Sequence, residues 1–198
     1  MVELYLIRNG ETEENLSAKI QGICNGKLTP KGIEQAKLVG KEFIKATITK
    51  VYCSPLGRAK DTFTHSTINL KPIFLSWLKE RDFGRMTNKG YMEVINLPPS
   101  HRPEGGESLE DLGERAKMFL DFVVKENIQD SCVVAFSHHE FILSCVAYVI
   151  GLPLRNFRKM TISNASITQM DYYNGKWIAK RINDVGHLGD LKQITVGY

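Results

Sequence analysis

The sequence predicts an α/β fold, a three-layer α/β/α sandwich with a mostly parallel sheet and a C-terminal β-hairpin. Apolar, β-prone runs at 2–8, 49–53 and 131–137 alternate with segments of helical periodicity, which is the pattern of strand–helix–strand units. The run 131–137 is apolar almost throughout, as expected for a central strand that is buried on both faces. An Asn174-Gly175 turn between two β-rich runs predicts the hairpin.

The N-terminal half supplies the first strand–helix units. Thr29 and Pro30 predict the start of a helix, because threonine caps free N–H groups and proline suits the first helical position. A second helix is expected from Arg58 to about Ser66, after the second strand breaks. Residues 72–83 are expected to be extended.

The segment 84–107 is rich in glycine, proline and polar residues. A linker is one interpretation, but only one core is indicated around it, so we expect a surface loop that caps the active site. Ser108 then opens a helix, and Asp111 is placed to complete a capping box. A last helix is expected after the third strand, up to about Ile150. We expect residues 1–198 to form a single domain.

Composition excludes several classes of protein. The 198 residues are 42% hydrophobic and 24% charged, which is ordinary for a globular chain. The net charge of +4 is small and dispersed, so a nucleic-acid partner is not indicated. No basic leader with an apolar stretch opens the chain, and its longest apolar run is too short to cross a bilayer. We therefore expect a cytoplasmic protein without a membrane partner.

Basic side chains stand at or just after the ends of three expected strands, at one edge of the sheet. Arg8 ends the first strand, Arg58 follows closely after the second, and His138 follows the third. Ligands bind outside the carboxyl ends of parallel strands. A phosphate monoester carries a charge of about −1.5 to −2, and arginine binds its oxygens in pairs. The sequence therefore predicts a phosphate-ester pocket, with Asn15 and the backbone near Gly10 as neutral donors.

Spaced motifs over nearly the whole chain closely resemble the histidine phosphatase superfamily, the phosphoglycerate-mutase-like group. That family opens with Arg-His-Gly-Glu-Thr, where this chain has Arg-Asn-Gly-Glu-Thr. The matching segments, in the order of the family, are LIRNGETEEN (6–15), IQG (20–22), LTPKG (28–32), YCSPLGRAKDT (52–62), LKERDFG (78–84), RPEGGES (102–108), FSHHE (136–140), NASIT (164–168) and NDVGHL (183–188).

The resemblance implies a metal-independent and cofactor-free phosphomonoesterase, which hydrolyses small phosphorylated metabolites through a phosphohistidine. Arg8 and Arg58 match the paired phosphate-binding arginines of the family. Glu80 matches the acid that protonates the leaving oxygen. His138 matches the second histidine, which donates to the phosphoryl group as charge builds up. Asn9 stands at the position of the nucleophilic histidine.

Further residues enter the pocket by the same resemblance: Asn15, Gln21 and Gly22 match phosphate-binding positions, and His139, beside His138, is counted with the phosphate-binding residues. His139 stands where the family usually has glycine. A displaced nucleophile is one interpretation of His139, but we expect it to shape the rim, because neighbouring side chains at a strand end point in different directions. The stretch 84–94 also departs from the family, and it leaves the substrate unidentified.

Asn9 is the main departure from the family. The lone pair of an amide nitrogen is delocalised into its carbonyl, so Asn9 cannot attack phosphorus. We expect a pocket that binds its ligand and has lost most of its turnover. Two accounts stay open: an engineered substrate trap, which the otherwise intact pocket favours, or a natural pseudoenzyme that binds a phosphorylated ligand without turnover.

The partner predicted by this pattern is a small phosphorylated metabolite or inorganic phosphate. A mutase of the phosphoglycerate type is a further alternative, although mutases usually carry a longer insertion than the short segment 84–107. The four cysteines and five histidines show no metal-ligand spacing, so no metal site is expected. The sequence leaves a monomer and a homodimer both open.

Overall fold

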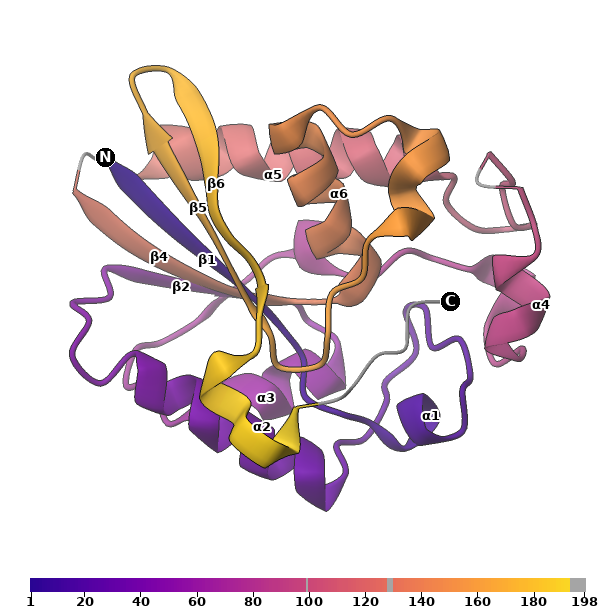
Figure 1. Cartoon of the computed structure of the whole chain (residues 1–198), viewed down its shortest axis with the longest axis horizontal. Helices are drawn as coiled ribbons and strands as arrows, with labels where there is room; N and C mark the ends of the chain where they lie inside the picture. The colour runs from indigo at the N-terminus through magenta and orange to yellow at the C-terminus, as the bar shows by residue number, and fades with distance from the viewer. Residues whose placement is uncertain (99, 128–129, 193–198) are drawn as a thin grey trace.

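The fold is taken from a computed structural model, which describes residues 1–98, 100–127 and 130–192 (Figure 1). Within this part of the chain, six strands form one sheet in the order β3-β2-β4-β1-β5-β6. The strands are β1 (Val2–Arg8), β2 (Lys50–Cys53), β3 (Ile73–Phe74), β4 (Ser131–Ser137), β5 (Ile167–Tyr173) and β6 (Lys176–Asp184). The α-helices are α1 (Glu13–Leu16), α2 (Pro30–Glu42), α3 (Gly57–Ser66), α4 (Tyr91–Ile95), α5 (Leu109–Glu126) and α6 (His139–Ile150). Four 3₁₀ helices are η1 (Ser76–Leu78), η2 (Gly84–Met86), η3 (Leu154–Lys159) and η4 (Gly186–Leu191).

The directions of the strands confirm the predicted sheet. Strands β1 to β4 run parallel to one another, whereas β5 pairs antiparallel with β1 and with β6. The β5–β6 hairpin turns at Asn174 and Gly175, which both have positive φ angles, of 49° and 79°. Such angles match the right-handed twist of two-residue hairpins, which is why Asn-Gly is favoured there.

Helices cover both faces of the sheet, as the three-layer prediction requires. Figure 1 shows α5 and α6 on one side and α2 and α3 on the other. Leu4 of β1 and Phe119 of α5 belong to one buried apolar cluster, whereas Ile7 of β1 and Val39 of α2 belong to the other. Alternation along β1 therefore supplies both cores. None of the helices in the described part is both long and apolar enough to cross a membrane.

Two predicted helix starts are confirmed by their caps. Helix α2 begins at Pro30, and the hydroxyl of Thr29 accepts a hydrogen bond from the Gly32 N–H at 3.0 Å. Helix α5 begins after Ser108, whose hydroxyl accepts from the Asp111 N–H at 3.1 Å. The Asp111 carboxylate accepts from the Ser108 N–H at 2.9 Å and completes the capping box.

The expectation that 72–83 is extended was wrong over most of its length. Strand β3 has only two residues, the Leu75 N–H adds one more bond to the sheet, to the Cys53 carbonyl at 3.0 Å, and η1 begins at Ser76. The physical reason is a competing partner, because the Arg115 guanidinium takes the carbonyls of Trp77 and Lys79 at 2.6 and 2.7 Å. Those carbonyls are not available to a strand ladder.

The segment 84–107 is more structured than a surface loop. It contains η2 and α4, and its backbone pairs with residues 18–20. The Asn88 N–H donates to the Ile20 carbonyl at 2.8 Å, and the Tyr91 N–H donates to the Ala18 carbonyl at 2.8 Å. A small apolar cluster lies beneath it, formed by Ile20, Phe83 and Val94. Tertiary pairing of this kind cannot be predicted from local composition.

We expect Gly40→Ala to destabilise the contact between α2 and α3. A Cβ at Gly40 would overlap the backbone carbonyl of Ser66, the last residue of α3. The free energy of unfolding should fall by about 2–4 kcal/mol, as measured by urea denaturation. Gly113→Ala in α5 is the control, since nothing lies within 4 Å of its added Cβ. The control should gain about 0.5–1 kcal/mol, and equal effects at both sites would contradict the packing described.

Candidate active site

The register of the sheet brings two predicted site residues side by side. Arg8 of β1 lies opposite Ser137 of β4, so Asn9 and His138 leave neighbouring strands together. The Asn9 N–H donates to the Ser137 carbonyl at 3.0 Å, which continues the ladder past the end of β1. Ser54 leaves β2 at the same edge, since its N–H donates to the Phe136 carbonyl at 2.9 Å (β2 adjoins β4).

A chain of hydrogen bonds links these three strand ends. His138 Nδ1 lies 3.0 Å from Asn9 Oδ1, and His138 Nε2 lies 2.7 Å from Ser54 Oγ. The Asn9 amide nitrogen donates to the Gly10 carbonyl at 2.8 Å. His138 and Ser54 are fully buried, and Asn9 is 3% exposed. The imidazole is therefore held rigidly from both sides.

Arg58 enters the site from the first turn of α3. Its guanidinium is 2% exposed and donates to the Cys24 carbonyl at 2.6 Å and to the Gly22 carbonyl at 2.8 Å. Burial lowers the pKa of Arg58, and the charge of Glu80 opposes this shift. Gly22, a predicted phosphate-binding residue, therefore orients Arg58 through its carbonyl.

Arg8 lies on the other side of the same edge. Its Nη1 donates to the Ile162 carbonyl, and its buried Nε has no hydrogen-bond partner among the residues described. Burial lowers the pKa of Arg8 to about 10, and the positive charge of Arg58 lowers it further, whereas the charges of Glu80 and Tyr91 raise it. The charges of Arg58 and Glu80 therefore act on Arg8, and the charge of Glu80 also acts on Arg58.

Glu80 caps the N-terminus of α6. Its Oε1 accepts from the N–H groups of Arg81, Glu140 and Phe141 at 3.0, 3.1 and 3.3 Å. A carboxylate suits this position because the first N–H groups of a helix lack internal partners. Oε2 accepts from the Glu140 N–H at 3.3 Å. Glu80, which the sequence motif singled out, is therefore held in place by backbone N–H groups, and it is only 8% exposed.

Both histidines after β4 are held in their neutral form. Burial lowers the pKa of His138 well below its ordinary value, and the charges of Arg58 and Arg8 lower it further. Burial and the charge of Arg8 lower the pKa of His139 to about 3. His139 Nε2 lies 3.4 Å from the Thr161 hydroxyl, whereas His138 faces Asn9 and Ser54. The two side chains thus take different directions, as the strand-end argument expected.

The predicted amide residues lie at different places around this edge. Asn15 Oδ1 accepts from the Thr12 N–H at 3.1 Å and from Asn164 Nδ2 at 3.1 Å. Gln21 donates through Nε2 to the Thr12 hydroxyl at 2.8 Å, and its buried Oε1 has no partner in the described part of the chain. Asn15 is therefore linked directly to the Asn9 loop through Asn164, whereas Gln21 contacts Thr12.

Asn164 was missed as a site residue. It is fully buried, and its Nδ2 also donates to the Asn9 and Gly10 carbonyls at 3.1 and 3.2 Å. It thus ties the start of β5 to the turn after β1. Asn164 opens the motif NASIT at 164–168, which resembles the family. The composition of that motif does not predict that its asparagine contacts the turn after the first strand.

Arg115 was missed as well. Its five N–H groups all find acceptors around the segment that carries Glu80. Two go to the Glu107 carboxylate, at 2.9 and 2.7 Å, and the others to the carbonyls of Trp77, Lys79 and Glu80, at 2.6, 2.7 and 3.3 Å. An arginine in the middle of an amphipathic helix has no sequence signal for such a role.

We expect Arg115→Ala to lower the free energy of unfolding by about 3 kcal/mol, because it removes five hydrogen bonds of a side chain that is only 14% exposed, three of them to backbone carbonyls. Lys117→Ala is the control on the same helix. Lys117 forms an exposed pair with Asp121 at 3.2 Å, so its removal should give no measurable change. Urea denaturation measures both, and an Arg115→Ala variant as stable as the control would contradict the role of this clamp.

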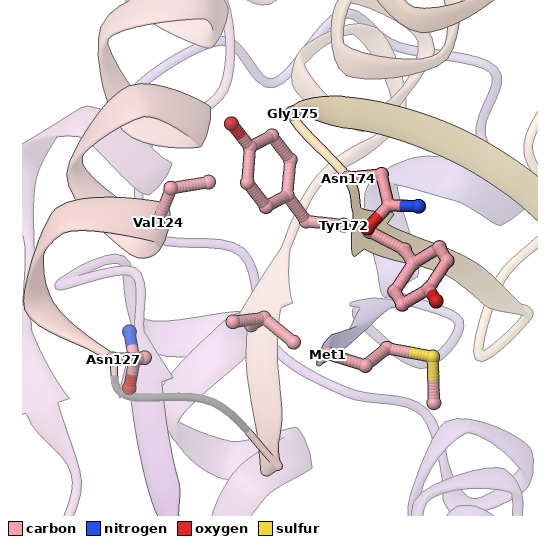
Figure 2. Close-up of a pocket in the computed structure, with 8 residues that line it drawn as sticks. Met1, Val124, Asn127, Tyr172, Asn174 and Gly175 are labelled. Carbon is pink, nitrogen blue, oxygen red and sulfur yellow. The ribbon is translucent and has the colours of Figure 1, made fainter.

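A separate cavity of about 290 Å³ lies at the opposite end of the sheet, where β1 begins (Figure 2). Met1, Tyr172 and Asn174 are among the residues around it. No arginine, lysine or histidine side chain lines this cavity, and neither does any predicted site residue. Among the described residues, no cluster of three histidine, cysteine, aspartate or glutamate side chains is arranged to hold a metal ion. The candidate site is therefore the cationic edge formed by β1, β2 and β4.

Fold and site together define an α/β protein that carries two arginines and a histidine near the carboxyl ends of its parallel strands. The model of the histidine phosphatase superfamily (branch 1) matches residues 4–185. A relative from Salmonella choleraesuis (strain SC-B67), described as a probable phosphoglycerate mutase GpmB, is 31% identical over 206 residues, with 95% of each chain covered. The chain belongs to the histidine phosphatase superfamily.

Solved structures give the same result. A mutant phosphoserine phosphatase from Entamoeba histolytica, in complex with phosphoserine, superposes with a TM-score of 0.85 at 27% identity. Bacillus stearothermophilus YhfR superposes with a TM-score of 0.88 at 25% identity. Both matches cover 95% of this chain and 100% of the other. The predicted phosphoglycerate-mutase-like fold is confirmed.

Proposed function

We propose that this chain is a phosphomonoesterase scaffold that binds a small phosphorylated metabolite. With asparagine at position 9, it hydrolyses this ligand poorly or not at all. The observation that carries the proposal is the placement of Asn9 beside His138, in a pocket with Arg8 and Arg58. An amide at this place can donate and accept hydrogen bonds, but its nitrogen cannot form the phosphohistidine on which the family reaction depends.

The proposed roles follow from charge and position. Arg8 and Arg58 hold the phosphoryl oxygens, since fixed guanidinium groups are suited to a dianion. His138 donates to an oxygen whose charge increases in the transition state. Glu80 protonates the leaving oxygen through Oε2, which has fewer hydrogen-bond partners than Oε1. We further propose that the chain works as one domain and that 84–107 caps the pocket.

The names of the relatives support a small, phosphorylated and acidic ligand. The phosphoserine phosphatase of Entamoeba histolytica was solved with phosphoserine, as a histidine-to-alanine mutant, and also with 3-phosphoglyceric acid. That mutant held its ligand, which supports binding without the histidine in this scaffold. Because one relative is described as a probable phosphoglycerate mutase, mutase activity is the alternative proposal for this chain. For Asn9, an engineered substrate trap and a natural pseudoenzyme remain the two proposals.

We expect Asn9→His to restore hydrolysis of p-nitrophenyl phosphate by at least about a thousandfold over the native chain, because it returns an imidazole nucleophile. The release of p-nitrophenol measures it. Both chains should be stabilised against heat by inorganic phosphate, since the cationic clamps are unchanged.

Asn9→Gln is the matched control, because it keeps an amide and should restore nothing. Restored turnover in Asn9→His would support the substrate-trap account. Phosphate binding without turnover in Asn9→His would support the pseudoenzyme. Rapid hydrolysis by the native chain would contradict the role given to Asn9.

A further inference from the structure

The direction of each hydrogen bond around His138 follows from groups that only accept. A carbonyl oxygen cannot donate, so the Asn9 amide nitrogen must face the Gly10 carbonyl, 2.8 Å away. This fixes the amide orientation and turns Asn9 Oδ1 toward His138. Oδ1 also only accepts, so His138 Nδ1, 3.0 Å from it, must carry a proton.

The hydrogen-bonding role of the other ring nitrogen, Nε2, then follows. A neutral imidazole has one N–H, so Nε2 is an acceptor and accepts a hydrogen bond from the Ser54 hydroxyl, 2.7 Å away. Ser54 Oγ in turn accepts from the Leu56 N–H at 3.3 Å. Complete burial and the charges of Arg58 and Arg8 oppose a second proton on the ring, because they lower the pKa of His138. The hydrogen bonds therefore run in one direction, from Leu56 to Gly10.

We propose that Ser54 is a positioning residue, whose hydroxyl holds His138 in the Nδ1–H form and so presents a fixed N–H donor at the position of Asn9 Oδ1. In the ligand-free chain Asn9 accepts this donor. When a phosphate binds, a phosphoryl oxygen replaces Asn9 Oδ1 as the acceptor. This last step rests on the proposed function, whereas the proton arrangement of the free chain does not.

The same geometry has the form of a nucleophile, a base and an orienting group. Two observations assign Ser54 a supporting role instead. Its side chain is fully buried, and Oγ is bonded on one side to the Leu56 N–H and on the other to His138. A covalent role for Ser54 is therefore an outcome that the experiment must be able to detect.

The test uses the full chain labelled with ¹⁵N-histidine. Long-range ¹H–¹⁵N spectra show which ring nitrogen carries the proton, and His138→Gln assigns the His138 signals. The native chain should show His138 as a single Nδ1–H form. Ser54→Ala should lose this preference and populate the Nε2–H form, whereas Ser54→Thr keeps the hydroxyl and should keep the native form.

Ser144→Ala is the matched control, because Ser144 is also a buried serine, 4% exposed, but its Oγ has no hydrogen-bond partner among the described residues. It should leave the His138 spectrum unchanged. Titration calorimetry with inorganic phosphate should show about tenfold weaker binding in Ser54→Ala, the loss expected for one hydrogen bond to a charged site. Ser54→Thr and Ser144→Ala should bind like the native chain.

An Nε2–H form of His138 in the native chain would overturn the role of Ser54, even if phosphate binds and even if Ser54→Ala does not fold. Phosphate found covalently on Ser54 by mass spectrometry, after incubation with p-nitrophenyl phosphate, would overturn it too. No phosphate binding by the native chain would overturn the ligand step together with the proposed function, while the spectra would still decide the proton arrangement.

Discussion

Arg58 is buried and Arg8 is partly buried at the strand-end edge, and neither guanidinium group has a carboxylate in hydrogen-bond contact. Arg58 and Arg8 donate to backbone carbonyls, which satisfy hydrogen bonds but do not neutralise charge. Neither forms an ion pair with any described carboxylate. Burying such charges costs several kcal/mol each. A phosphoryl dianion would neutralise them and supply acceptor oxygens, which is the physical basis of the proposed anion site.

The rest of the fold keeps this pocket rigid. Parallel pairing of β1, β4 and β2 fixes the spacing of Asn9, His138 and Ser54. Glu80 is held by the N-terminus of α6 on one side and by the Arg115–Glu107 clamp on the other. A rigid surround matters because a site that binds a transition state must not reorganise as charge moves. Under the proposed function the same rigidity would serve ligand binding, since the amide at position 9 offers no nucleophile.

Local sequence patterns were sufficient for residues at the ends of regular elements. Arg8 and His138 could be placed because each follows a strongly apolar strand, and parallel strands end at one edge. Ser54 and Asn164 could not, since their partners depend on strand register and on a contact between residues far apart in the chain. The prediction of an extended segment at 72–83 was wrong for the same reason: carbonyls of this β-prone segment accept hydrogen bonds from Arg115, on a helix distant in sequence. Propensity is a local property, whereas these outcomes depended on tertiary partners.

A crystal structure of the full chain soaked with inorganic phosphate tests phosphate binding by this pocket most directly. The phosphate should lie between the guanidinium groups of Arg8 and Arg58, with one oxygen within hydrogen-bond distance of His138 Nδ1. The cavity beside Met1 and Tyr172 should stay free of phosphate. A phosphate bound elsewhere, or a pocket that stays empty while Arg8 and Arg58 keep their carbonyl partners, would contradict this assignment.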